Sequence, residues 1–141
     1  MDHESRAEGS PVAGARVLVV DDEPDHSTTI CGILAREGIV VCTAASAEEA
    51  RAWAEREQFH VGVVDLRLPG HDGLEIMHQL RERQPWLEVI ILTAYPTPAT
   101  CKAALSAGAA AYLEKPFSPE AFRALVTTLL ERARPAAPPP D

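Results

Sequence analysis

Short apolar runs alternate with amphipathic segments along most of the chain. The apolar runs are rich in valine, isoleucine and leucine and cover residues 16–20, 39–43, 60–64, 88–92 and 110–113. Runs of this length that end at turn residues are typical of strands buried on both faces of a sheet. Between the runs, apolar positions recur with helical spacing over residues 25–37, 46–58, 73–83, 97–107 and from 118 onward. The pattern therefore predicts five strands, each followed by a helix.

Residues at the ends of these segments support the predicted boundaries. Ser46 and Ser118 stand where helix N-caps are expected, and Pro119 follows at a first helical position. Gly38 and Gly108 stand where helices end. Five alternations of strand and helix predict an α/β fold, a doubly wound five-stranded parallel sheet of the flavodoxin-like (βα)5 type, with helices on both faces.

The length of 141 residues suits one domain. Residues 1–14 carry few large apolar groups, and we expect a disordered lead there. The domain is predicted over residues 15–134. Residues 135–141 are rich in proline and are predicted to be a tail or the stub of a linker.

Composition narrows the classes of function. The formal net charge of −8 argues against direct nucleic-acid binding, which requires a basic surface. No apolar stretch approaches the roughly 20 residues of a membrane span, and the N-terminus lacks the pattern of a secretory signal. The three cysteines are an odd number without a CxxC motif, so we expect buried, reduced thiols and a cytoplasmic location.

Polar side chains stand where the predicted strands end. Asp21 and Asp22 follow the first strand, Asp65 the third, Thr93 the fourth and Lys115 the fifth. Parallel strands bring these ends to one edge of the sheet, where ligands bind in such folds. Three clustered carboxylates repel one another unless a cation is present, and their oxygens suit Mg²⁺ or Mn²⁺. A lysine and a hydroxyl beside them predict a pocket for a tetrahedral anion, with an aspartate able to accept a phosphoryl group.

Each of these residues alone has an ordinary explanation, because aspartate often caps helices and begins turns. Three other classes of site lack their motifs. No GxxxxGK[ST] motif is present for nucleotide hydrolysis, and no GxGxxG motif follows the first strand for dinucleotide binding. A phosphatase of the haloacid dehalogenase type requires an acid two residues after its nucleophile, where this chain has Arg67.

Four segments resemble the receiver domain of bacterial two-component response regulators. They are VLVVDDE at residues 17–23, VVDLRLPGHDG at 63–73, ILTAY at 91–95 and AGAAAYLEKPF at 107–117. The resemblance covers about residues 15–133. It implies that Asp65 is the phosphoacceptor, that Asp22 ligates Mg²⁺ directly and that Asp21 does so through water. The backbone carbonyl of Arg67 is implied as a third protein ligand.

The resemblance also assigns roles around the phosphate. Thr93 is implied to hydrogen-bond one phosphoryl oxygen and Lys115 to pair with another, with a cis peptide bond before Pro116. Tyr112 is implied as the switch aromatic that follows Thr93 between two positions. Arg67 and Tyr95 border the expected path of attacking water, so we expect them to tune the lifetime of the phosphate. The switched surface is the fourth helix, the fifth strand and the fifth helix.

The implied donor is a sensor histidine kinase or a histidine phosphotransfer protein. The protein is then a signalling phosphoacceptor rather than an enzyme acting on other substrates. Its output is a downstream protein or an output domain absent from this sequence. The resemblance does not decide whether a homodimer forms through the switched surface. Ala110 and Ala111 replace the paired aspartates that winged-helix regulators use in such a dimer. The alternative is a pseudo-receiver, an interaction module that works without phosphorylation.

Overall fold

The computed structural model describes residues 12–68 and 70–133. Within them, five parallel strands form one sheet in the order β2-β1-β3-β6-β7. These strands are β1 (Arg16–Val20), β2 (Val40–Ala44), β3 (Val61–Asp65), β6 (Glu88–Thr93) and β7 (Ala111–Glu114). The order places β3 in the centre, between β1 and β6, so the three strands that carry the predicted carboxylates and Thr93 are neighbours.

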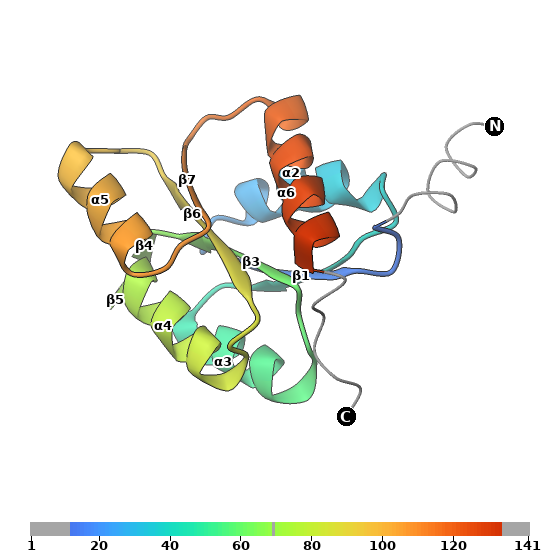
Figure 1. The fold of residues 1–141 in the computed structure, drawn as a ribbon, viewed down its shortest axis with the longest axis horizontal. Coiled ribbons are helices and arrows are strands. Elements are labelled where there is room, and N and C mark those ends of the chain that lie inside the picture. The colour runs from blue at the N-terminus through green and yellow to red at the C-terminus, as the bar shows by residue number, and fades with distance from the viewer. Residues whose placement is uncertain (1–11, 69, 134–141) are drawn as a thin grey trace.

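Over residues 12–68 and 70–133, five helices cover the two faces of this sheet (Figure 1). They are α2 (Pro24–Ala35), α3 (Ala47–Arg56), α4 (Gly73–Arg83), α5 (Pro98–Ser106) and α6 (Pro119–Ala133). Helices α2 and α6 lie on one face, while α3, α4 and α5 lie on the other. The predicted doubly wound, five-stranded parallel fold is therefore confirmed.

Each face of the sheet packs into its own apolar cluster. On the α2–α6 side, Ile30 and Leu34 of α2 meet Phe122 and Val126 of α6. On the other side, Ile76 and Leu80 of α4 pack with residues of α3, α5 and the sheet. Alternate residues of the central strands point into the two clusters, since side chains alternate along a strand. Burial of this apolar area supplies the main driving force for folding.

The two outer strands are less buried than the three central ones. Strand β2 is exposed at Val40 and Thr43, partly buried at Val41 and Cys42, and buried only at Ala44. Strand β7 is also only partly buried. Both lie at the edges of the sheet, where helices cover less of each face. The cysteines are likewise only partly buried, contrary to the prediction, and all three are free thiols.

A short hairpin follows β3 and was not predicted. Its strands β4 (Arg67–Leu68) and β5 (His71–Asp72) pair in antiparallel orientation. Two residues per strand are too few to produce a recognisable alternation of apolar and polar positions. Gly70 lies between the strands with φ of +76°, a conformation that glycine adopts without steric cost.

Gly73 fixes the distance between this hairpin and the end of β3. A Cβ atom at this position would meet the carbonyl oxygen of Asp65 and would lie 2.7 Å from the Cα atom of Leu66. The Gly73 amide donates to the Leu66 carbonyl at 2.7 Å. Asp72 caps α4 by accepting from the Leu74 amide at 2.9 Å. The first turn of α4 is thus packed directly against the backbone that carries Asp65.

The packed part of the chain includes residues before the predicted start of the domain. Val12 is buried, and the Gly14 amide donates to the Gly38 carbonyl at 2.9 Å. The predicted lead and tail lie mainly in residues 1–11 and 134–141, outside the described residues. Over residues 12–68 and 70–133, no helix is both long enough and apolar enough to cross a bilayer.

Candidate functional site

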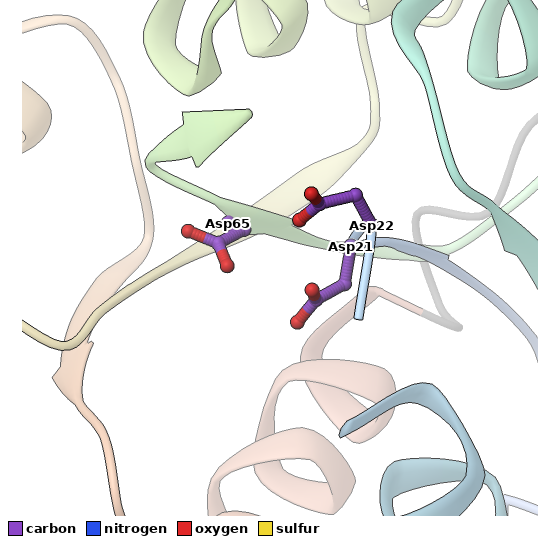
Figure 2. Close-up of side chains that lie close together, drawn as sticks. All are labelled: Asp21, Asp22 and Asp65. Carbon is purple, nitrogen blue, oxygen red and sulfur yellow. The ribbon is translucent and has the colours of Figure 1, made fainter. Parts of the chain in front are cut away.

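Three aspartates gather at the carboxyl ends of β1 and β3 (Figure 2). Asp21 and Asp22 directly follow β1, and Asp65 is the last residue of β3. One carboxylate oxygen of each lies within 4.8 Å of the others. Asp21 and Asp65 are buried, whereas Asp22 is exposed. The parallel register of β1 and β3 creates this cluster, because it brings the two strand ends side by side.

Backbone amides hold two of the carboxylates in place. The Glu23 amide donates to Asp21 Oδ1 at 2.9 Å, and the Arg67 amide donates to Asp65 Oδ1 at 3.0 Å. In each case an aspartate accepts from the backbone two residues later, which is a common local turn. Each of these two carboxylates therefore keeps its Oδ2 for other partners.

Lys115 supplies those partners. Its Nζ atom donates to Asp65 Oδ2 at 2.7 Å and to Asp21 Oδ2 at 3.1 Å. Its backbone amide donates to the Thr93 carbonyl at 2.8 Å, and its peptide bond to Pro116 is cis, the geometry that the resemblance implies. The lysine thus joins the end of the fifth parallel strand to the carboxylates of the first and third.

Opposing effects act on the pKa of Lys115. Burial lowers it, but the hydrogen bonds and the attraction from Asp65 and Asp21 outweigh burial and raise the pKa above its ordinary value. Because the pKa of Lys115 is raised, its ammonium is fully charged at neutral pH and loses its proton only in strongly alkaline solution. The site accordingly presents a permanent positive charge beside Asp65.

Thr93 ends β6 and is buried. Its Oγ1 atom accepts from the Tyr95 amide at 3.1 Å, which leaves the hydroxyl proton free to be donated elsewhere. A cleft of about 530 Å³ brings together the predicted site residues other than Asp21, Tyr112 and Pro116. It is lined by Asp22, Glu23, His26, Asp65, Arg67, Leu68, Thr93, Ala94, Tyr95 and Lys115.

Tyr112 occupies a different place, on β7 beside α5. Its hydroxyl shares a hydrogen bond with Oγ1 of Thr100, and its ring packs against the apolar cluster on the α3–α4–α5 side. Thr100 lies in the first turn of α5 and completes a capping box with Thr97. The predicted switch aromatic is therefore linked to α5 in this structure.

His26 is a member of the site that sequence reasoning missed. Its Nδ1 atom lies 2.9 Å from Lys115 Nζ and 3.4 Å from Asp21 Oδ2. No local pattern in the sequence indicated it, because His26 lies in the first turn of α2 and its partner Lys115 is 89 residues away in the chain. Of the other histidines, His71 is exposed and His78 pairs with Glu82 on the surface of α4.

The donor set fits a hard divalent cation. Three carboxylates converge, whereas Lys115 is the one lysine or arginine that pairs with them among the described residues. Over residues 12–68 and 70–133, the Asp22 carboxylate forms no hydrogen bond or ion pair. Carboxylate oxygens are the ligands that Mg²⁺ prefers, and a cation would relieve the repulsion among them.

Comparison with known proteins identifies the family. The model of the response regulator receiver domain matches residues 17–127, which is most of the chain. The chain belongs to this family. Such domains belong to two-component signalling systems and bind Mg²⁺ in general.

One similar curated protein is the alginate biosynthesis transcriptional regulatory protein AlgB of Pseudomonas aeruginosa. It is 40% identical to this receiver over 116 residues, covering 82% of this chain and 26% of AlgB. The receiver therefore spans about a quarter of that regulator. It spans about half of the probable transcriptional regulatory protein TcrX of Mycobacterium tuberculosis, which is 40% identical over 90% of this chain.

A solved structure agrees in fold. A CheY-like receiver domain protein of Methanospirillum hungatei has a TM-score of 0.82 at 30% identity, covering 87% of this receiver and 98% of that chain.

Proposed function

We propose that this receiver accepts a phosphoryl group on Asp65 and thereby switches the surface formed by α5, β7 and α6. The proposal rests chiefly on the 2.7 Å contact between Asp65 Oδ2 and Lys115 Nζ beside the three-carboxylate cluster. A carboxylate paired with a charged lysine in an acidic cleft is suited to nucleophilic attack on phosphorus.

The transfer follows an in-line course. An oxygen of the Asp65 carboxylate attacks the phosphorus of a phosphohistidine, and the new P–O bond forms as the P–N bond breaks. The departing imidazole nitrogen takes the bonding electron pair, and the histidine remains on the donor protein. Hydrolysis of the acyl phosphate restores the free Asp65 carboxylate. Water attacks phosphorus, the Asp65 carboxylate leaves, inorganic phosphate departs and a proton passes to solvent.

Asp21, Asp22 and Asp65, with the backbone carbonyl of Arg67, would hold Mg²⁺ or Mn²⁺. The ion supplies positive charge that neutralises the transferring oxygens. Lys115 contributes a second positive charge next to Asp65 Oδ2. Thr93 contributes a hydroxyl proton, which is unused in its bond with the Tyr95 amide.

Phosphorylation changes local charge and hydrogen bonding, and a two-state element responds. We infer that Thr93 moves toward the phosphoryl group and that Tyr112 changes position with it. Because Tyr112 is bonded to Thr100 of α5, its movement alters the relation of α5 to β7. The altered surface then binds a target protein, an output domain or a second copy of the receiver more tightly.

The donor is a cytoplasmic sensor histidine kinase or histidine phosphotransfer protein. The receiver is a signalling phosphoacceptor that promotes only its own phosphorylation and dephosphorylation. AlgB and TcrX are named as transcriptional regulators. Regulation of transcription through another part of a longer regulator is therefore the output that we propose for this chain.

A related solved structure supports the choice of reaction. It is a response regulator protein from Burkholderia pseudomallei with a phosphorylated aspartic acid, a calcium ion and citrate. That protein is 32% identical, with a TM-score of 0.75, and the match covers 86% of this receiver and 72% of that chain.

Intact-mass measurement after incubation with Mg²⁺ and acetyl phosphate tests the proposal. We expect the wild type to gain one phosphate and Asp65→Asn to gain none, with no gain by the wild type when a chelator is present. Asp72→Asn is the matched control, because Asp72 lies in the same loop and asparagine also caps helices. A wild type that gains no phosphate, from acetyl phosphate or from phosphohistidine donors, would favour the pseudo-receiver.

A further inference from the structure

The Lys115 ammonium lies among three acceptors. Two are the Oδ2 atoms of Asp65 and Asp21, at 2.7 Å and 3.1 Å. The third is Nδ1 of His26, at 2.9 Å. The lysine side chain is only 12% exposed, so most of it is packed against the protein.

The chemistry of the two side chains fixes the direction of the third bond. An ammonium has three N–H donors and no acceptor. Nδ1 of His26 must therefore accept, and the neutral ring carries its proton on Nε2. The three acceptors match the three donors of Lys115, and together they hold a long, flexible side chain in one position.

Two of these acceptors acquire other tasks in the proposed reaction. Asp65 becomes an acyl phosphate and loses its carboxylate charge, and Asp21 takes part in metal binding. His26 has no such task, so it can keep its bond to Lys115 throughout. We propose that His26 is a positioning residue that holds the Lys115 ammonium toward the phosphoryl group, an inference that rests on the proposed function.

The fold places His26 for this role through the start of α2. The helix begins at Pro24, with only Glu23 between it and the two aspartates that follow β1, so its first turn lies beside the end of that strand. The His26 side chain is 44% exposed. One side of it lines the cleft above Asp65, and the other lines a cavity of about 330 Å³ with Pro116 and Phe117. A half-exposed ring can be replaced without disturbing the core.

Removal of the acceptor nitrogen should slow phosphorylation without unfolding the protein. We expect His26→Leu to lower the rate constant for phosphorylation by acetyl phosphate by about fivefold to tenfold, a change within the range of an ordinary net hydrogen-bond contribution. His26→Asn should restore at least half of the wild-type rate, because the asparagine Oδ1 atom can occupy the place of Nδ1. His78→Leu is the matched control, since His78 lies on the exposed surface of α4.

A second measurement needs neither metal nor phosphate. Nitrogen-15 NMR of the histidine rings in metal-free protein should show His26 as the Nε2–H tautomer, with Nδ1 accepting a hydrogen bond. Lys115→Met should shift the Nδ1 resonance of His26 and leave that of His78 unchanged. Thermal unfolding of each variant shows that the fold is intact.

The outcomes separate the two proposals. If the wild type is phosphorylated on Asp65 but His26→Leu reacts within twofold of its rate, the role of His26 is wrong and the proposed function stands. A His26→Asn variant as slow as His26→Leu, or an Nδ1 resonance that does not respond to Lys115→Met, also contradicts the role of His26. A wild type that takes no phosphate contradicts the proposed function itself, whatever the NMR spectra show.

Discussion

Asp65 is held from two sides by groups that the chain itself provides. The Arg67 amide fixes Oδ1, and the Lys115 ammonium fixes Oδ2. A nucleophile held in this way needs little reorganisation when a donor arrives, which is how preorganised sites lower barriers. The sequence predicted Asp65 and Lys115 because both follow apolar runs. It did not predict His26, because nothing local to a helix start indicates which distant side chain it will meet.

At the residue scale, Tyr95 is expected to protect the phosphate. Its side chain is 71% exposed and lines the same cleft as Asp65, so it lies where water would approach. Tyr95→Ala should accelerate dephosphorylation about fivefold, corresponding to about 1 kcal/mol of barrier. Phosphate loss followed by intact mass measures the rate, with Val40→Ala on the edge strand β2 as the exposed control. A rate within twofold of wild type contradicts the role of Tyr95.

At the scale of elements, α5 and β7 are joined through Thr100. Its hydroxyl completes the capping box with Thr97 and also bonds the Tyr112 hydroxyl. One side chain therefore links the start of the helix to the switch aromatic. The sequence predicted a helix over residues 97–107 and a switching role for Tyr112. The contact between them was not predictable, because it depends on how α5 lies beside β7.

Thr100→Val tests this link. Valine keeps the shape of the side chain but removes the hydroxyl, so Tyr112 loses its partner and α5 loses part of its capping box. We expect altered Tyr112 ring resonances in carbon-13 NMR and a loss of about 1 kcal/mol in the free energy of unfolding. Tyr112→Phe identifies the resonances, and Thr128→Val on the exposed side of α6 is the control. Unchanged Tyr112 resonances would show that Thr100 does not hold the ring.

At the scale of the whole molecule, the excess of acid is partly concentrated at one edge of the sheet. The chain carries a formal net charge of −8. Three of its acids converge at this edge, and two of them pair with Lys115. Like charges at such distances raise the free energy of the folded state, because the unfolded chain separates them. A bound cation would offset the repulsion among these carboxylates and so lower the free energy of the folded state.

Mg²⁺ should therefore stabilise the folded protein. A ligand that binds only the native state adds about 2.7 kcal/mol when its concentration is a hundred times its dissociation constant. Urea unfolding in MgCl₂, against KCl at equal ionic strength, measures the gain. We expect Asp22→Asn to lose most of the gain and to be at least as stable as the wild type without metal. Asp72→Asn should keep the gain, and an equal gain in Asp22→Asn would contradict the proposed metal site.

The sequence by itself determined the alternation of strands and helices and the residues at each strand end. Apolar periodicity and capping residues express local preferences that each segment carries alone. The tertiary structure decided which strands lie at the edges, where the β4–β5 hairpin forms, and which side chains complete the site. His26 and Lys115 are 89 residues apart in the chain. They meet because the folded sheet brings the start of α2, which follows β1, and the end of β7 to the same edge. Packing between distant segments leaves no periodic trace in the sequence.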